Sequence, residues 1–427
     1  MEYGLLGEHL PHSFSKIIHD EIGLYKYELN ELSESQFDEF MKSRAFKGVN
    51  ITMPYKQRAM HFCDCLDEKA QKIGAINTVI NKDGKLYGYN TDYYGLKLLA
   101  INNGIDFTAK KVLILGNGGA SKAAIAVAED LGAKEIIIAH YKKTDGVVSY
   151  EEVLKNYTDA EIIVNTTPVG MYPNNDGEII DLNNFKSLSG VIDVIYNPIN
   201  TNLVLQAKKL NINAVGGLYM LVGQAVFAAD LFLNTNQIVN KLDEIYSKLL
   251  KQKSNIVLVG MPASGKSTVA KELGKTLGLS VYDTDELIVK KFGNISNIFE
   301  KYGETYFRKL ETEVIIEVSK LSGVIIATGG GAVLSKENVN ALKQNGKFFF
   351  LNRPLEELLP TEDRPLANDK DKIISLYNQR IDIYKSVADV TVSVTNNPQT
   401  AVKEILTNFK KVKYACSNRK IKYFWFG

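Results

Sequence analysis

The residues best suited to do chemistry form a glycine-rich run from Gly260 to Ser267. Its spacing is a glycine, four residues, and then Gly265, Lys266 and Ser267, between an apolar run and a helical pattern, as a phosphate-binding loop requires. Glycines let backbone N–H groups turn toward phosphate oxygens, the lysine reaches the β- and γ-phosphates, and the serine hydroxyl is a ligand for Mg²⁺. The sequence therefore predicts a nucleoside-triphosphate site here.

A second glycine-rich turn, Gly116–Ser121, also follows an apolar run and opens a helical pattern, which is typical of dinucleotide binding. Ser121 stands where a third glycine is often found, so the turn alone is a weak signal. The next predicted strand ends in His140, Tyr141 and two lysines, where an NAD site often has an acidic residue for the ribose 2′-hydroxyl. The missing acid and the added cations favour NADP.

Lys56 and Asp92 are candidates for proton transfer in the N-terminal part of the chain. Reduction of a ketone by hydride leaves an alkoxide that needs a proton donor, and a lysine held by a carboxylate can exchange protons. The alternatives are a solvated surface lysine and, for Asp92, an Asx turn or helix cap. Ser13 and Ser15 would face the same side of an extended segment, although isolated hydroxyls often bond only to the local backbone.

Short apolar runs alternate with helical patterns along almost the whole chain, which predicts βαβ units and parallel sheets. The expected strands are 111–116, 135–140, 161–166, 190–195, 255–260, 323–330 and 347–352. Two glycine-rich openings predict two nucleotide-binding units. We expect a helix through about 218–250 and a domain boundary in the polar stretch Ser247–Ser254.

Composition narrows the class of protein. The chain has 427 residues, 45% hydrophobic and 23% charged, with a formal net charge of +2, which disfavours a whole-protein nucleic-acid binder. The three cysteines, Cys63, Cys65 and Cys416, lack the ligand spacing of a zinc site and fit a reducing cytoplasm. No apolar stretch is long enough to span a membrane and the N-terminus lacks signal-peptide features, so we expect a cytoplasmic protein.

The C-terminal segment, Lys410–Gly427, has six basic residues, no acidic ones and several aromatic side chains. Such a segment could bind an anion or a partner, but a poorly ordered extension is the expectation we favour.

Further motifs accompany the phosphate-binding run in the C-terminal half. They are a D-x-D pair, a G-E-x-x-F-R-x-x-E stretch, three consecutive glycines, an R-P-L segment and a late R-x3-Y, and the half of about 254–410 therefore resembles a shikimate kinase. The matching residues are Asp283, Asp285, Gly303, Glu304, Phe307, Arg308, Glu311, Gly329, Gly330, Gly331, Arg364 and Arg380.

This resemblance implies that ATP and Mg²⁺ are used to phosphorylate shikimate. Asp285 would hold the shikimate hydroxyls and help orient or deprotonate the attacking one, and Asp283 would act near Mg²⁺ together with Ser267. Arg364 would close with a lid over the transferring phosphoryl group. The other implied contacts are Arg308, Gly330 and Arg380 to the substrate, and Gly260, Ala263, Ser264, Gly265, Lys266, Ser267 and Thr268 to the nucleotide. Taken singly, each arginine could instead form a surface ion pair.

The N-terminal part carries its own set of motifs. They are H-S-x-S (12–15), G-x-N-[VI]-T-x-P-x-K (48–56), G-A-x-N-T (74–78), N-T-D (90–92), N-T-T-P-x-G-M (165–171), D-x-x-Y-x-P (193–198) and G-x-x-M-L-V-x-Q (217–224). Over about 1–245 the chain therefore resembles shikimate dehydrogenase. His140–Lys142 replaces the usual N-R-T patch of this family, which leaves the cofactor preference open.

This second resemblance implies reduction of 3-dehydroshikimate with NADPH, with Lys56 and Asp92 as catalytic residues. The implied substrate contacts are Ser13, Ser15, Thr52, Asn77 and Gln224, and the implied cofactor contacts are Gly116, Asn117, Gly118, Gly119 and Ala120. The expected α/β architecture is a substrate domain at 1–100 completed by a helix at about 218–247, a Rossmann domain at 101–217, a P-loop kinase domain at 254–410 and a basic tail at 411–427.

Consecutive reactions that share one intermediate are thus the function that the sequence favours. A first alternative is a dehydrogenase that uses quinate and NAD. A second is that one half is a non-catalytic scaffold or ligand sensor, and a third is a nucleic-acid role for the basic tail. The expected partners are small-molecule substrates, with no nucleic acid and no membrane, and the sequence leaves the oligomeric state open.

Overall fold

The computed structural model describes residues 1–10, 14–142, 144–358, 369–395 and 397–410. Internal contacts divide the chain into two compact units. Unit 1 comprises Met1–Asn197 and Gln206–Lys248, and unit 2 comprises Pro198–Leu205 and residues 249–410. Within these ranges, no helix combines the length and the apolar character needed to cross a membrane.

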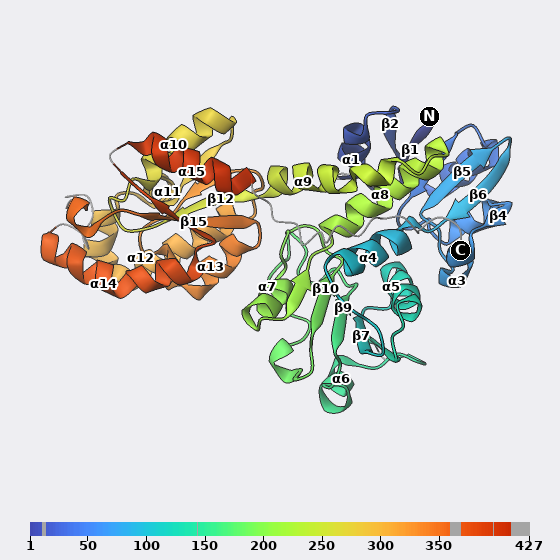
Figure 1. The fold of residues 1–427 in the computed structure, drawn as a ribbon, viewed down its shortest axis with the longest axis horizontal. Coiled ribbons are helices and arrows are strands. Elements are labelled where there is room, and N and C mark those ends of the chain that lie inside the picture. The colour runs from blue at the N-terminus through green and yellow to red at the C-terminus, as the bar shows by residue number, and fades with distance from the viewer. Residues whose placement is uncertain (11–13, 143, 359–368, 396, 411–427) are drawn as a thin grey trace. The chain divides into compact units, whose positions relative to one another are not determined.

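The first sheet of unit 1 has six strands in the order β2-β1-β3-β5-β6-β4 (Figure 1). Strand β1 pairs in parallel with β2 and β3, whereas β5 is antiparallel to β3 and β6. The elements are β1 (Tyr3–Gly7), α1 (Phe14–Ile22), β2 (Tyr27–Glu31), α2 (Glu34–Ser43), β3 (Gly48–Ile51), a 3₁₀ turn η1 (Arg58–Phe62), β4 (Cys65–Leu66), α3 (Glu68–Ile73), β5 (Thr78–Lys82) and β6 (Lys85–Tyr89).

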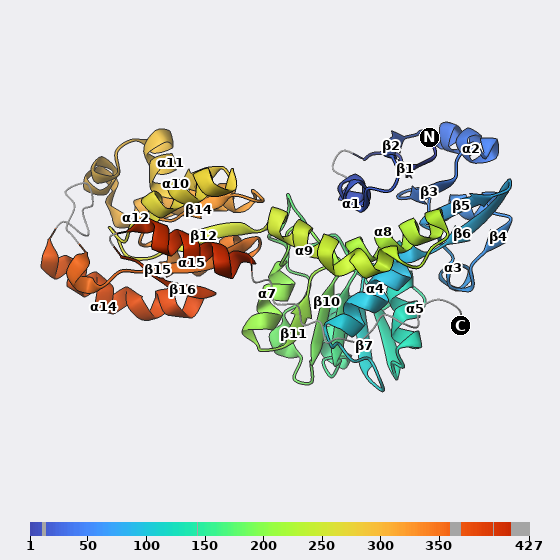
Figure 2. The same ribbon diagram turned by 45° about the horizontal axis from the view of Figure 1, so that its top comes forward.

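Helix α8 (Leu218–Leu233) covers one face of this sheet although it lies far along the chain. Ala228, Leu231 and Phe232 of α8 pack against Tyr3 of β1 and Tyr27 of β2. Figure 2 shows α8 running beside α4 (Thr91–Asn102), the helix that leaves the first sheet. Because one face of β1 and β3 packs on α8 and the other on α2, these strands are buried at every residue.

The expected single helix through about 218–250 is wrong. Helix α8 ends at Leu233, where Asn234 takes a left-handed conformation with φ 49°, and a 3₁₀ turn η3 (Ile238–Lys241) and helix α9 (Leu242–Lys253) follow. The carboxylate of Asp230 accepts the N–H groups of Ile238 and Val239 at 2.8 and 3.1 Å. A buried carboxylate that caps the next turn is a long-range feature that helical periodicity does not report.

The second sheet of unit 1 is parallel throughout, with the order β11-β10-β9-β7-β8. The chain enters at β7 and then builds outward on both sides, so a crevice forms at the carboxyl ends of β7 and β9. The elements are β7 (Lys111–Leu115), α5 (Gly119–Asp130), β8 (Glu135–Ala139), α6 (Tyr150–Asn156), β9 (Ile162–Asn165), η2 (Leu182–Asn184), β10 (Gly190–Asp193), α7 (Asn202–Lys209) and β11 (Asn213–Val215).

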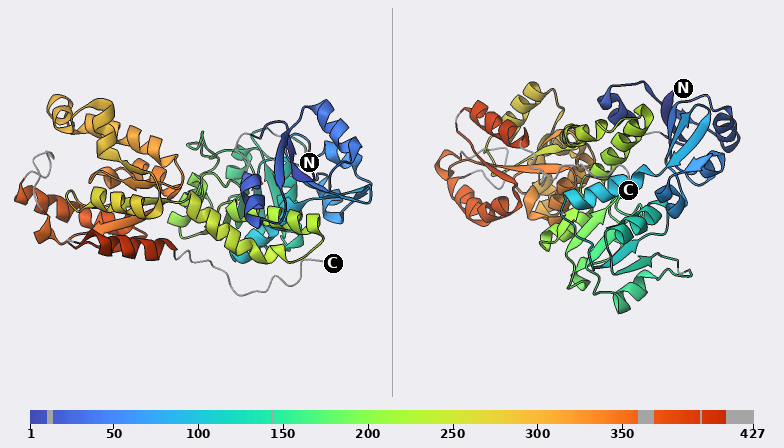
Figure 3. Two further views of the ribbon diagram at one scale, coloured as in Figure 1. Left: turned by 90° about the horizontal axis from the view of Figure 1, so that it is seen from above. Right: turned by 45° about the vertical axis from the view of Figure 1, so that its right-hand side comes forward.

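The sheet of unit 2 is also parallel, with the order β13-β14-β12-β15-β16. Alternate residues of β12 face opposite layers: Ile256 and Leu258 pack with α10 and α15, and Val257 and Val259 pack with α12, α13 and α14. Figure 3 shows helices on both faces of this sheet. The elements are β12 (Asn255–Val259), α10 (Lys266–Leu277), β13 (Val281–Asp283), α11 (Thr284–Phe292), α12 (Ile295–Ser319), β14 (Ile325–Ala327), η4 (Ala332–Leu334), α13 (Lys336–Lys343), β15 (Gly346–Asn352), η5 (Leu355–Glu357), α14 (Lys370–Val387), β16 (Val390–Ser393) and α15 (Pro398–Lys410).

Candidate active sites

A cavity of about 560 Å³ opens in unit 1. Its walls come from the end of β3, the first turns of α1 and α4, the turn after β10 and helix α8. The predicted site residues that line it are Ser15, Thr52, Lys56, Asn77, Asp92, Ala120 and Gln224. The sequence positions are far apart, and the parallel strands and α8 bring them to one place. Ser13 lies outside the described residues.

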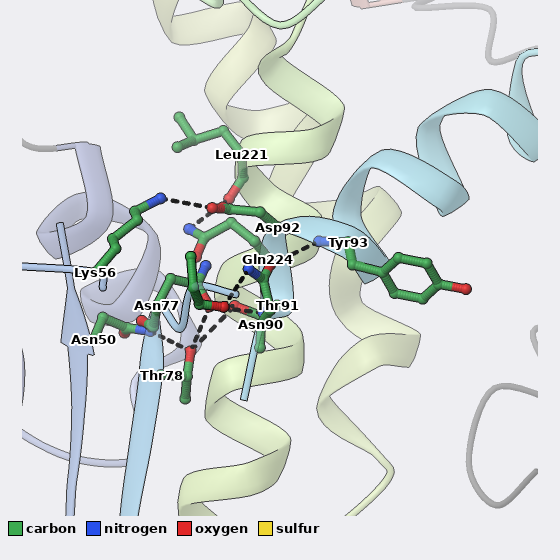
Figure 4. A network of polar contacts seen from close by, with 11 residues as sticks. Asn50, Lys56, Asn77, Thr78, Asn90, Thr91, Asp92, Tyr93, Leu221 and Gln224 are labelled. Atoms are coloured by element: carbon green, nitrogen blue, oxygen red, sulfur yellow. Dashed lines mark hydrogen bonds and ion pairs between the residues drawn. The ribbon is translucent and has the colours of Figure 1, made fainter. Parts of the chain in front are cut away.

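Lys56 and Asp92 meet at the wall of this cavity (Figure 4). The Nζ atom of Lys56 lies 2.6 Å from Oδ2 of Asp92, and the two side chains are 25% and 18% exposed. The helix-cap role that the sequence left open for Asp92 belongs to Asn90, whose side chain accepts the N–H of Tyr93 at 3.2 Å. Asp92 stands in the first turn of α4, and its carboxylate holds the lysine ammonium instead.

Hydrogen-bonding side chains surround this ion pair. Asn77 is buried just before β5, and Gln224 on α8 donates to the carbonyl oxygen of Leu221 at 3.0 Å. Ser15 stands in the first turn of α1, and Thr52 follows β3. Several N–H and O–H groups beside an ammonium–carboxylate pair suit a small polar ligand with hydrogen-bonding oxygens.

The Gly116–Ser121 turn links β7 to α5 at the crevice of the second sheet. Gly116 has φ +111°, and a Cβ atom there would lie 2.6 Å from Oγ1 of Thr166, so only glycine fits without strain. Gly118 is the N-cap of α5 and makes no side-chain cap, and a Cβ atom on Gly118 or Gly119 would meet nothing within 4 Å. The helix N-terminus is therefore open to an anion such as a pyrophosphate, which fits a dinucleotide.

Two aromatic residues that line the unit 1 cavity were not assigned a role from the sequence. Tyr196 belongs to the quoted D-x-x-Y-x-P motif, and its ring meets that of Phe14 edge to face with centroids 5.5 Å apart. Burial raises the pKa of the Tyr196 hydroxyl, which keeps it protonated as a possible donor. The motif was the signal that could have identified Tyr196, whereas nothing in the sequence marked Phe14.

The second site lies at the carboxyl end of the unit 2 sheet. The Gly260–Ser267 run links β12 to α10, with positive φ at Gly260, Ala263 and Gly265. Lys266 is 7% exposed, and its Nζ donates to the carbonyl oxygens of Gly260 and Met261 at 2.9 and 2.8 Å. Ser264 is buried within the turn, and Thr268 stands in the first turn of α10. This is the geometry of a loop that can close around phosphates.

Ser267 and Asp283, the two predicted metal ligands, lie side by side. The hydroxyl of Ser267 donates to Oδ2 of Asp283 at 2.5 Å. The other carboxylate oxygen caps α11 by accepting the N–H groups of Asp285 and Glu286 at 3.0 and 3.4 Å. One hydroxyl and one carboxylate are hard oxygen donors of the kind that Mg²⁺ takes alongside phosphates and water. Nowhere in the described ranges do three or more His, Cys, Asp or Glu side chains gather as a metal cage.

The residues predicted to contact shikimate lie around the Gly329–Gly331 turn after β14. A Cβ atom on Gly329 would lie 2.7 Å from both Oδ1 of Asp285 and Oε1 of Glu311, so these side chains press directly on the turn. Nη1 of Arg380 donates to the carbonyl oxygen of Gly330 at 3.2 Å. The hydroxyl of Tyr384 donates to the same oxygen. The four predicted residues Asp285, Arg308, Gly330 and Arg380 thus lie around one turn.

The buried carboxylate of Glu311 forms an ion pair with Arg308. Oε2 of Glu311 lies 2.7 Å from Nη1 of Arg308, and Glu311 is 1% exposed. Burial raises the pKa of Glu311, and the guanidinium of Arg308 offsets part of that. Glu311 and Tyr384 matched the kinase pattern but were given no role from the sequence. Tyr384 bonds to a turn that is distant along the chain, and the burial of Glu311 depends on tertiary packing. Arg364 and the rest of the expected lid lie outside the described residues.

Comparisons with known proteins agree with this division. The family model for the shikimate dehydrogenase substrate binding domain matches residues 5–79, and the model for shikimate kinase matches residues 262–410. A shikimate dehydrogenase (NADP(+)) from Clostridium beijerinckii is 40% identical over 264 residues, which are 57% of this chain and 96% of the relative.

Solved structures resemble the same N-terminal region. Shikimate dehydrogenase 1 from Peptoclostridium difficile has 36% identity and a TM-score of 0.53, and the match covers 58% of this chain and 98% of that one. Quinate dehydrogenase from Corynebacterium glutamicum in complex with NAD has 26% identity and a TM-score of 0.53, covering 58% and 99%. The N-terminal part of this chain belongs to the shikimate dehydrogenase family, and a shikimate kinase domain follows it in the same polypeptide.

Proposed function

We propose that this bifunctional enzyme of the shikimate pathway reduces 3-dehydroshikimate to shikimate with NADPH and then phosphorylates shikimate with ATP to shikimate 3-phosphate. The observation that carries the proposal is that the described residues form two sites with different reacting groups. One pairs Lys56 with Asp92, and the other places Lys266 in a phosphate loop. We assign substrate binding to 1–100 with 218–247, dinucleotide binding to 101–217 and phosphorylation to 254–410.

In the dehydrogenase site, bound NADPH supplies hydride to the ketone carbon of 3-dehydroshikimate. The carbonyl oxygen gains negative charge, and the ammonium of Lys56 donates the proton that converts it into a hydroxyl. Asp92 holds the lysine in place at 2.6 Å. Ser13, Ser15, Thr52, Asn77 and Gln224 orient the ring through its carboxylate and hydroxyls.

The choice of NADP over NAD rests on the residues after β8. His140, Tyr141 and Lys142 follow the strand directly, and Lys142 lies over the ring of Tyr141 at 5.4 Å. This segment offers a cation and an exposed aromatic face to a 2′-phosphorylated adenosine. Gly116, Asn117, Gly118, Gly119 and Ala120 would receive the pyrophosphate.

In the kinase site, ATP would supply the phosphoryl group, and Ser267 and Asp283 would hold a Mg²⁺ ion that, when bound, would neutralise phosphate charge. Asp285 accepts a hydrogen bond from the attacking shikimate hydroxyl and so orients it. Arg308 and Arg380 bind the substrate carboxylate beside Gly330, while Lys266 and Arg364 stabilise charge on the transferring group. Gly260, Ala263, Ser264, Gly265 and Thr268 complete the phosphate cradle.

Two assays on the purified full-length chain test the proposal. NADPH oxidation should require 3-dehydroshikimate, and ADP release should require both shikimate and Mg²⁺. If the rates with NAD and quinate equalled or exceeded those with NADP and shikimate, the quinate alternative would be supported instead. The similarity to a quinate dehydrogenase is the observation that favours this alternative. Ligand binding by calorimetry in one half without turnover would contradict the proposal and support a scaffold or sensor role for that half.

Glu311→Gln is expected to raise the KM for shikimate in the kinase reaction about tenfold, with a smaller effect on kcat. The substitution keeps the shape but removes the buried charge that holds Arg308, and hydrogen bonds to charged groups are the strong ones. The matched control is Glu304→Gln, because Glu304 also contacts Arg308, at 2.9 Å, but is 48% exposed. Solvent weakens such a pair, so less than about a threefold change is expected there. Equal effects of the two substitutions would argue against this role for Glu311.

A further inference from the structure

A chain of hydrogen-bonded, buried polar side chains reaches the dehydrogenase cavity at Asn50 and Asn77, and Figure 4 shows its part from Asn50 to Thr91. It crosses from β2 to β3 and β5 and ends at the first turn of α4. Each member is at most 5% exposed; the members are Tyr27, Asn50, Asn77, Thr78 and Thr91. Buried polar groups without partners are costly, so a fully bonded chain has one preferred arrangement of donors and acceptors.

The direction of this chain is set at Tyr27. Its hydroxyl donates to Oδ1 of Asn50 at 2.8 Å, and burial raises the pKa of Tyr27 well above its ordinary value, so the proton stays. The ring is held by stacking on His19, with centroids 3.8 Å apart, and burial lowers the pKa of His19 to about 3, so the imidazole is neutral. With Oδ1 of Asn50 turned to the tyrosine, its amide nitrogen faces β5.

From Asn50, hydrogen bonds are donated through Thr78 to Asn77. The amide nitrogen of Asn50 donates to Oγ1 of Thr78 at 3.0 Å, and Thr78 donates to Oδ1 of Asn77 at 3.2 Å. The backbone N–H and the hydroxyl of Thr91 also donate to Oδ1 of Asn77, at 2.6 and 3.1 Å. The hydroxyls of Thr78 and Thr91 also lie 3.1 Å apart, and either can donate to the other, so the N–H of Thr91 and one of the two hydroxyls fill the two lone pairs of this oxygen. The amide nitrogen is therefore the atom that Asn77 offers to the cavity it lines.

We propose that Tyr27 is a positioning residue of the dehydrogenase site, which acts through Asn50 and Thr78 to make Asn77 a hydrogen-bond donor to a substrate oxygen. The same bonds fix Thr91, the neighbour of Asp92, and so steady the carboxylate that holds Lys56. The inference rests on the proposed function of unit 1 and deepens it: the substrate group at Asn77 is an acceptor, such as a hydroxyl, ketone or carboxylate oxygen.

Tyr27→Phe tests the relay because it removes one hydroxyl and keeps the ring that stacks on His19. The KM for 3-dehydroshikimate should rise about five- to tenfold, the effect of losing one hydrogen bond that fixes an amide. In an Asn77→Ala background the same substitution should change KM less than about twofold, because the group that it positions is already gone. Tyr219→Phe is the control: Tyr219 is also buried, but its hydroxyl donates to Asp243 at 2.9 Å, and Tyr219 is not among the residues that line the cavity.

A second variant keeps the inference testable if Tyr27→Phe folds poorly. Asn77→Asp retains the acceptor oxygen but presents a second oxygen to the cavity, so its KM should exceed that of Asn77→Ala. Equal KM values for these two variants, or an equal effect of Tyr27→Phe with and without the Asn77 amide, would overturn the relay. A wild-type chain that does not reduce 3-dehydroshikimate would overturn the proposed function instead, so the two failures are distinct.

Discussion

Lys56→Ala is expected to lower the kcat of NADPH-dependent reduction by about 10²–10⁴-fold, the range of a positioned general acid, and to leave phosphorylation of shikimate unchanged. Lys56 is the one lysine or arginine among the described residues that line the unit 1 cavity. Among the described lining residues, no other lysine or arginine can therefore take over the proton transfer. The two rates are measured on the same preparation, so the kinase rate reports on unit 2, and the thermal unfolding of the variant checks that unit 1 is folded.

The matched control for this substitution is Lys110→Ala. Lys110 forms an ion pair with Glu161 at 2.6 Å, the same separation as between Lys56 and Asp92, and it is 31% exposed. It precedes β7 and does not line the cavity. If the two lysine variants lost reduction equally, the loss would reflect a weakened unit 1, and the role of Lys56 as proton donor would be contradicted.

The strands and their glycine turns were the part of the fold that the sequence predicts best. All of the expected strands, from Lys111–Leu115 to Gly346–Asn352, are present, because buried parallel strands read as continuous apolar runs. The segment 323–330 forms a shorter strand than expected, Ile325–Ala327, since the following glycines make the turn that receives Asp285 and Glu311. The mixed first sheet was not anticipated, because polar residues interrupt the apolar pattern of strands such as Tyr27–Glu31 and Thr78–Lys82.

The site residues were predicted from motifs, and the structure brings several of them to one cavity. Lys56, Asp92, Asn77 and Gln224 were expected at one cavity and line it. The supporting residues were missed because their role depends on strand order. Tyr27 is 23 positions from Asn50, and they meet only because β1 lies between β2 and β3 and the tyrosine side chain reaches across it. Spacing along the chain carries no signal of that contact.

Lys266→Ala is expected to remove phosphorylation of shikimate, with a fall in kcat of at least about 10²–10³-fold, and to leave the reduction of 3-dehydroshikimate unchanged. The Nζ atom is bonded to the carbonyl oxygens of Gly260 and Met261 within the loop, so the charge is already positioned where the phosphates would lie. Alanine cannot supply that charge to the transferring phosphoryl group. Lys275→Ala is the control, since Lys275 stands on the same helix α10 but is 74% exposed and pairs with Glu272.

The reciprocal pattern of the two lysine variants decides whether the chain holds two independent enzymes. Lys56 is bound to a carboxylate of unit 1, and Lys266 is bound to a loop of unit 2. We expect the charge of each lysine to act over a few ångströms, on the substrate of its own unit. Neither substitution should therefore change the rate of the reaction at the other site. A mixture of the two variants should convert 3-dehydroshikimate to shikimate 3-phosphate, because free shikimate can pass from one molecule to the other. If either lysine variant lost both activities while its thermal unfolding stayed unchanged, the sites would be coupled, and the independence argued from their separate geometry would be wrong.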